Sequence, residues 1–221
     1  FEVQQNEVMG IIGPNGSGKT TMMNLISGAL RVSEGSIGLN GRFISTLTAS
    51  QINQRGIART FQLVRVLPGL SVVENCMAGM VFGHRRLWGD QARYEAGKLI
   101  ERVGLSGKEA VPVGSLTYID QKRLELARAL ASSPKLLLLD EWLAGLNPTE
   151  LQEGIDLIRS LREEGITIIL VEHVMDAIRS LCDRCIVMAA GSKIAEGSPG
   201  EVLADPEAVS YTHLTLPTNG L

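Results

Sequence analysis

The 221-residue sequence has no hydrophobic run long enough for a membrane helix, and it has few cysteines. Its longest strictly aliphatic stretches are Leu136 to Leu139 and Ile168 to Val171, far short of the roughly 20 apolar residues that a spanning helix needs. The three cysteines, Cys76, Cys182 and Cys185, are too sparse for a disulfide framework and suit a reducing compartment. We therefore expect a cytosolic protein.

The sequence also lacks an excess of positive charge. Lys and Arg number 21 against 24 Asp and Glu, which leaves a net charge of −3 and argues against a nucleic-acid-binding protein. Apolar residues make up 44% of the chain and charged residues 20%, a composition that excludes intrinsic disorder. The length and composition predict one globular domain or two tightly joined subdomains.

Neither end of the sequence reads as a natural terminus. The chain begins with Phe1 rather than Met, as though inside a strand, so we expect a missing N-terminus. Residues 209–218 are what the codons GTC TCT TAT ACA CAT CTG ACG CTG CCG ACG encode, which resembles a transposase adapter used for sequencing libraries. We interpret 209–221 as a non-native, adapter-derived tail and exclude it from the reasoning about the fold.

The first motif lies between an apolar run, Val8 to Ile12, and a helix-compatible segment, Lys19 to Ala29. Strand, glycine-rich loop and helix in this order predict a phosphate site, because backbone N–H groups at a helix N-terminus bind anions. Lys19 would reach the β- and γ-phosphates, and Thr20 would offer its hydroxyl to Mg²⁺. The alternative is an ordinary turn before a helix. The candidate nucleotide-binding residues are Gly13, Pro14, Asn15, Gly16, Ser17, Gly18, Lys19, Thr20 and Thr21.

The second motif is a pair of carboxylates, Asp140 and Glu141, directly after the apolar strand Leu136 to Leu139. Ligands of open α/β sheets bind at the carboxyl ends of strands. Asp140 would bind Mg²⁺ through water, and Glu141 would act as the general base toward the water that attacks the γ-phosphate. Taken alone the pair is a weak signal, since acidic residues commonly cap the next element.

Strands and helices alternate along the chain, which predicts an α/β fold with a mainly parallel sheet. Residues 36–44 carry Asn40-Gly41 and predict a small antiparallel hairpin. Residues 63–115 show helical patterns without strands. We expect a nucleotide-binding core at 1–62 and 116–208 and an inserted helical subdomain at 63–115.

These residues resemble the ATP-binding subunit of ATP-binding cassette (ABC) transporters over Phe1 to about Ala208, which implies the P-loop ABC ATPase fold. By this resemblance Gln62 is the Q-loop glutamine, which senses Mg²⁺, and residues 144–148 form the D-loop. His173 would be the switch histidine that contacts the γ-phosphate. Each of these matches alone could be structural, but their order along the chain is that of the family. The resemblance implies ATP and Mg²⁺ as ligands and Glu141, Gln62 and His173 as catalytic residues.

The sequence departs from the family in the signature segment, where residues 116–120 read Leu-Thr-Tyr-Ile-Asp instead of Leu-Ser-Gly-Gly-Gln. Thr117 keeps a hydroxyl that would bind the ATP held by a second subunit. Ile119 replaces a glycine, and a β-branched residue resists positive φ. Either this loop follows another path, or closure of the dimer on ATP is weakened. Trp142 replaces the usual proline, and we assign it only a packing role.

The segments at 56–62, 71–75 and 144–150 are most similar to ATPases of branched-chain amino acid importers. This resemblance implies a dimer with a second ABC ATPase subunit, docking on two membrane permeases, an indirect link to a substrate-binding protein and no nucleic acid. The chain would then lie peripherally at the cytoplasmic face of the membrane. Open alternatives are an ATP-holding subunit with weak turnover in an asymmetric heterodimer, an ATPase for urea or amide import, and a soluble ABC ATPase outside transport.

Overall fold

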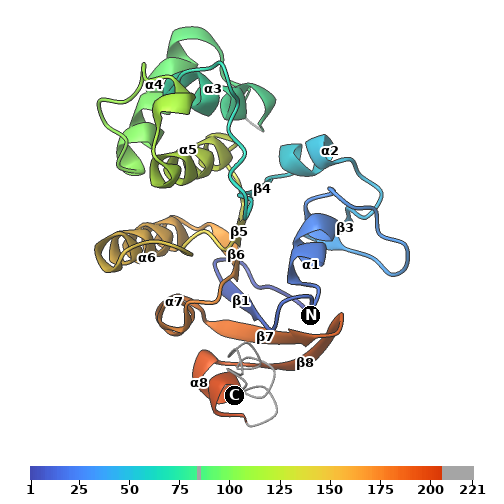
Figure 1. Cartoon of the computed structure of the whole chain (residues 1–221). Helices are drawn as coiled ribbons and strands as arrows, with labels where there is room; N and C mark the ends of the chain where they lie inside the picture. The colour runs from blue at the N-terminus through green and yellow to red at the C-terminus, as the bar shows by residue number, and fades with distance from the viewer. Residues whose placement is uncertain (84–85, 206–221) are drawn as a thin grey trace, which may run out of the picture. The chain divides into compact units, whose positions relative to one another are not determined.

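A computed structural model describes residues 1–83 and 86–205, which form two compact units (Figure 1). The first unit comprises residues 1–23 and the chain from residue 143 onward, and the second comprises residues 24–142. Helix α1 (Lys19–Ile26) begins in the first unit and ends in the second. The proposed non-native tail at 209–221 lies outside the described residues.

The sheet of the first unit is built around β1 (Val8–Ile12), which pairs in parallel with β6 (Thr167–Val171) and β7 (Arg184–Ala189). Strand β8 (Ser192–Gly197) pairs antiparallel with β7. Every residue of β1 is buried, which explains why its sequence is uniformly apolar rather than alternating. The parallel pairing places the segments that follow β1 and β6 at the same edge of this sheet.

Three further helices belong to the first unit: α6 (Pro148–Glu163), α7 (Met175–Leu181) and α8 (Pro199–Ala204). Helix α6 begins as its sequence predicts, because Asn147 Oδ1 accepts a hydrogen bond from Glu150 N at 3.0 Å. The Glu150 carboxylate accepts one in return from Asn147 N at 2.9 Å, which completes a capping box.

The second unit contains a parallel strand pair, β4 (Ile57–Arg59) and β5 (Leu136–Asp140). The short helix α2 (Ala49–Gln54) precedes β4. The predicted hairpin consists of β2 (Gly38–Leu39) and β3 (Arg42–Phe43), joined by Asn40 and Gly41 with φ of 50° and 73°. Positive φ at both turn residues is what the Asn-Gly sequence favours.

The longer helices of the second unit are α3 (Val72–Phe82), α4 (Gly89–Arg102) and α5 (Tyr118–Ala131), with the 3₁₀ turn η1 (Val113–Ser115) before α5. All three helices contact one another (Figure 1). Residues 63–115 therefore contain helices and no named strand within their described part, whereas the proposed boundaries of a helical subdomain stay a prediction. No described helix is long and apolar enough to cross a membrane.

Helix α5 begins at Tyr118, so its first turn includes residues 118–120 of the altered signature segment. The reason is the N-cap: Thr117 Oγ1 accepts a hydrogen bond from Asp120 N at 3.2 Å. Ile119 consequently lies in the first turn of a helix and is not among the described residues with positive φ. The backbone strain that a β-branched residue would suffer at positive φ does not arise at this position.

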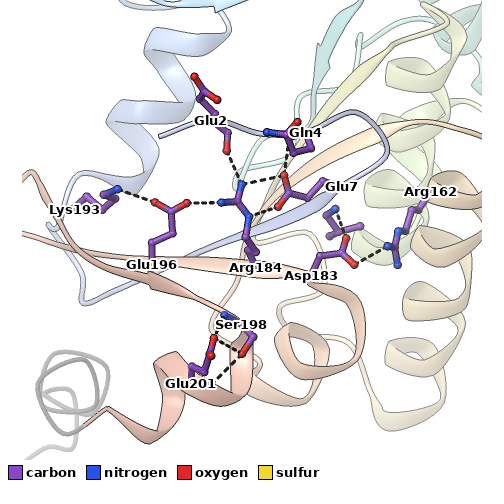
Figure 2. A network of polar contacts seen from close by, with 11 residues as sticks. Glu2, Gln4, Glu7, Arg162, Asp183, Arg184, Lys193, Glu196, Ser198 and Glu201 are labelled. Carbon is purple, nitrogen blue, oxygen red and sulfur yellow. Dashed lines mark hydrogen bonds and ion pairs between the residues drawn. The ribbon is translucent and has the colours of Figure 1, made fainter.

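Arg184 connects the chain before β1 to the start of β7 and to β8 (Figure 2). Its guanidinium bonds Glu7 Oε1 at 2.5 Å, Glu196 Oε1 at 2.6 Å and the main-chain oxygen of Glu2 at 2.7 Å. Burial raises the pKa of Glu7, but hydrogen bonds from Arg184 and from Gln4 N outweigh it and hold this pKa below its usual value. Glu7 therefore depends on Arg184 for its charge to be tolerated.

We expect Arg184→Met to lower the free energy of unfolding by about 2 kcal/mol, because the Glu7 carboxylate is left buried without its cation. For a chain of this size that corresponds to a fall in Tm of about 4–8 °C in a thermal melt at pH 7. The loss should shrink as the pH falls, since the depressed pKa stabilises the fold only while Glu7 is ionised.

Arg159→Met is the matched control for this experiment. Its ion pair with Asp156 joins side chains that are 45% and 56% exposed, so its removal should change the free energy of unfolding by less than about 0.5 kcal/mol. Equal effects of the two substitutions would contradict the role given to Arg184.

Candidate functional site

The glycine-rich loop of the first unit connects β1 to α1 and encloses the side chain of Lys19. Only 6% of Lys19 is exposed, and its Nζ donates to Gly13 O at 2.8 Å and to Pro14 O at 2.9 Å. Thr20 and Thr21 are exposed in the first turn of α1. The ammonium group and the N-terminus of α1 together form a positively polarised loop, which favours an anionic ligand.

The backbone of this loop leaves no room for larger residues at its first glycine. A Cβ built on Gly13, whose φ is 146°, would lie 2.1 Å from Met188 O on β7. The loop is also tied to the turn after β7, where Gly191 N donates to Ser17 O at 3.0 Å. Ser17 is 2% exposed, and its Oγ has no hydrogen-bond partner among the described residues, as expected where a ligand supplies one.

His173 follows β6 by two residues and is exposed. Because β1 and β6 are parallel neighbours, the glycine-rich loop and His173 extend from the same edge of the sheet of the first unit. The preceding residue, Glu172, is fully buried, and its Oε1 accepts a hydrogen bond from Leu143 N at 2.6 Å. This bond fixes the end of β6 from which His173 projects.

In the second unit, the structure brings together two of the predicted catalytic residues. Gln62 follows β4, Glu141 follows β5, and Gln62 Nε2 donates to Glu141 Oε2 at 2.7 Å. Glu141 has a φ of 52°, an uncommon conformation for a residue other than glycine. A polarised carboxylate with a hydrogen-bonded amide beside it can accept a proton from a water and orient that water.

Asp140, the last residue of β5, is 1% exposed and forms an ion pair that the sequence did not reveal. Its Oδ2 accepts from Arg59 at 2.7 Å, and Arg59 also donates to Asn24 Oδ1 at 2.6 Å and Ser27 Oγ at 3.1 Å. Asp140 Oδ1 has no hydrogen-bond partner in the described part of the chain. One oxygen of the carboxylate is thus held in place while the other is available for a ligand.

The segment around Gln62 is fixed by Glu125 of α5, a second contact that sequence reasoning missed. The Glu125 carboxylate accepts from Phe61 N at 3.2 Å and from Arg65 N at 2.8 Å, which bracket Gln62. The pKa of Glu125 is raised because its carboxyl is buried. The ring of Phe61 also lies against the guanidinium groups of Arg59 and Arg65, at 4.8 and 4.1 Å from its centroid.

Trp142 has the packing role that its sequence position suggested, and it also forms a hydrogen bond to helix α5. Its side chain is buried, and its Nε1 donates to the main-chain oxygen of Lys122 at 3.2 Å. The indole thereby links the residue after Glu141 to helix α5. Thr117, the remaining predicted ligand-binding residue, is exposed at the N-cap of the same helix.

The loop residues of the first unit fit a phosphate ligand, and the carboxylate of Asp140 in the second unit fits a cation. The enclosed Lys19, the unpartnered Ser17 Oγ and the tight backbone at Gly13 suit phosphate oxygens. The available Oδ1 of Asp140 suits an oxygen-preferring cation. No group of three or more His, Cys, Asp or Glu that could hold a metal occurs among the described residues.

Comparison with known proteins gives consistent matches. The profile of the family described as "ABC transporter" matches residues 1–144. The high-affinity branched-chain amino acid transport ATP-binding protein LivG of Salmonella typhimurium is 36% identical over 224 residues, covering 95% of this chain and 88% of LivG.

Solved structures of ATP-binding cassettes also match most of this chain. A nucleotide-free ATP-binding cassette from an ABC transporter is 30% identical with a TM-score of 0.85, covering 96% of this chain and 89% of that one. A cassette solved as a dimer in a post-hydrolysis state with ADP and phosphate is 25% identical with a TM-score of 0.83, covering 90% and 88%.

We expect Gly13→Ala to abolish nucleotide binding and to destabilise the protein, because the added methyl group would collide with Met188 O. Gly97→Ala, in α4, is the matched control: its Cβ meets nothing within 4 Å and should stabilise the helix by about 0.5–1 kcal/mol. Binding of a fluorescent ATP analogue and thermal melts of both variants check this. Normal binding by Gly13→Ala would contradict the assignment of the loop.

Proposed function

Because this chain belongs to the ABC transporter family and is an ATPase of that family, we propose that it powers an importer of branched-chain amino acids. The observation that carries the ATPase mechanism is the 2.7 Å hydrogen bond between Gln62 and Glu141 at the ends of two paired strands. The substrate class rests on the similarity to LivG, which extends over 95% of this chain.

In this proposal the glycine-rich loop, Gly13 to Thr20 with Thr21, binds the phosphates of ATP through its backbone N–H groups and Lys19. Mg²⁺ would be held by Thr20, by Asp140 through water and by Gln62. When bound, the ion neutralises charge on the phosphate oxygens. Arg59 orients the Asp140 carboxylate by bonding its Oδ2, so that its Oδ1 stays available.

Glu141 is the proposed general base, and Gln62 holds its carboxylate in a defined orientation. His173 would contact the γ-phosphate from the segment after β6. These three residues are polar and lie at the ends of buried strands, where rigid backbone fixes their positions.

ABC ATPases of importers act as dimers together with membrane permeases. We propose that this chain pairs with a second ABC ATPase subunit, whose bound ATP Thr117 contacts, and docks on two permeases at the cytoplasmic face of the membrane. A substrate-binding protein would be linked indirectly through these permeases. This arrangement makes the chain a peripheral subunit.

We expect Glu141→Gln to abolish ATP hydrolysis while retaining ATP binding, because the amide cannot accept the proton of the attacking water. Lys19→Ala should lose both, since its ammonium is enclosed by the phosphate loop. Phosphate release and binding of a fluorescent ATP analogue measure the two properties. Glu101→Gln, an exposed change on α4, is the control and should behave as the wild type. Unimpaired hydrolysis by Glu141→Gln would refute the proposed base.

The substrate class is tested in the source cell by introducing Glu141→Gln into the chromosomal gene. Uptake of labelled leucine should fall to the background level, whereas uptake of labelled urea should be unchanged. The reverse result would assign the chain to a urea or amide importer, and no change in either would remove the transport proposal.

A further inference from the structure

Two side chains on helix α5 contact the pair formed by Gln62 and Glu141. Lys122 is 3% exposed, and its Nζ donates to the main-chain oxygen of Glu141 at 3.3 Å. The same Nζ lies 5.6 Å from the centroid of the Tyr118 ring, within the range of a cation–π interaction. The Tyr118 hydroxyl in turn donates to Gln62 O at 3.5 Å, the longest hydrogen bond of the set.

These contacts close a ring of four residues: Gln62, Glu141, Lys122 and Tyr118. The ring crosses three chain segments, namely the ends of β4 and β5 and the first two turns of α5. Both Gln62 and Glu141 are held twice, once through their side chains to each other and once through a main-chain oxygen to α5. Neither can shift without breaking a contact to the other or to the helix.

Glu141 needs such support because its backbone is in the left-handed region, with φ of 52°. A residue other than glycine is strained in this conformation, and the conformation persists only where the surroundings hold it. Lys122 holds the carbonyl of Glu141, and Trp142 Nε1 bonds back to the carbonyl of Lys122 at 3.2 Å. The turn at Glu141 is therefore bonded to α5 in both directions.

We propose that Lys122 and Tyr118 are positioning residues for ATP hydrolysis, which act by fixing the backbone of Glu141 and of Gln62. This inference rests on the proposed function, in which Glu141 is the general base. A carboxylate displaced by 1 Å from its productive position can lose a large part of its catalytic effect. Lys122 and Tyr118 thus affect the rate of the chemical step and not the binding of ATP.

The test uses the full chain and compares four proteins in single-turnover hydrolysis with the enzyme in excess: wild type, Lys122→Met, Lys122→Arg and Glu141→Gln. Lys122→Met keeps the aliphatic stem and loses the donor, so the rate should fall about tenfold. The Kd for a fluorescent ATP analogue should change less than twofold, and the Tm should stay within about 2 °C because the main-chain bond to Trp142 survives. Lys122→Arg retains a donor and a cation and should recover at least half of the lost rate.

Tyr118→Phe supplies an independent test, because it removes only the hydroxyl that bonds Gln62 O. We expect the rate to fall two- to threefold in the wild-type background and not to fall further when Lys122→Met has already opened the ring. This non-additivity is expected of groups that act through one network. Tyr94→Phe, on the exposed face of α4, is the control and should have no effect in either background.

The outcomes distinguish a failure of the proposed function from a failure of the positioning role of Lys122 and Tyr118. Full activity of Glu141→Gln would remove the proposed base and with it the proposed function. Inactive Glu141→Gln together with a normal rate for Lys122→Met would leave the function in place and overturn the positioning role. A Lys122→Met protein with a lower Tm, weaker ATP binding and no recovery by Lys122→Arg would assign Lys122 to packing alone, which also overturns it.

Discussion

The parallel pairing of buried strands is the constraint on which both candidate regions depend. A strand that is covered on both faces must be apolar along its length, so it can carry polar side chains only where it ends. β1 and β6 satisfy this in the first unit, and β4 and β5 satisfy it in the second. Since parallel strands end at one edge, the residues that follow neighbouring strands become neighbours although they are far apart in the sequence.

The carboxylates of Asp140 and Glu125 are buried near the ends of β4 and β5, and each is held by hydrogen bonds from neighbouring groups. Asp140 is 1% exposed and pairs with Arg59, while Glu125 accepts two main-chain hydrogen bonds. Breaking a buried ion pair by removing one partner typically costs about 3–5 kcal/mol, because the other charge is left without compensation. Arg59 is therefore required as the partner of the buried Asp140, whereas Glu125 holds the main chain on both sides of Gln62 through its bonds to Phe61 N and Arg65 N.

The sequence predicted the elements whose signals are local. The glycine-rich loop and the hairpin at Asn40-Gly41 each depend on residues within eight positions of one another, and the structure contains both elements. The relatives and solved structures confirm the ABC ATPase fold. The roles of the individual site residues stay predictions, because they require a bound nucleotide to be tested.

The contacts that the sequence did not predict join residues far apart along the chain. Arg59 and Asp140 are separated by 81 positions, and Phe61 and Glu125 by 64. No spacing rule connects such pairs, since their proximity follows from strand pairing and helix packing. Trp142 and Lys122 are closer together in the sequence, 20 positions apart. Their hydrogen bond nevertheless depends on how α5 packs near the end of β5. The start of α5 at Tyr118 was visible in principle, because Thr117 and Asp120 stand at N-cap and N3 positions.

The altered signature segment, residues 116–120, can be understood from the start of helix α5 at Tyr118. Thr117 Oγ1 uses a lone pair to accept the hydrogen bond from Asp120 N, so its own proton remains available for an anionic oxygen. Capping the helix and binding a phosphate are thus compatible in one hydroxyl group. Ile119 follows within the first helical turn, where a β-branched residue is tolerated without positive φ. Asp120 pairs with Lys108 at 2.5 Å, which offsets the negative charge that replaces a neutral residue of the family's signature three positions after Thr117. The segment therefore keeps its cap and its donor despite the loss of glycine.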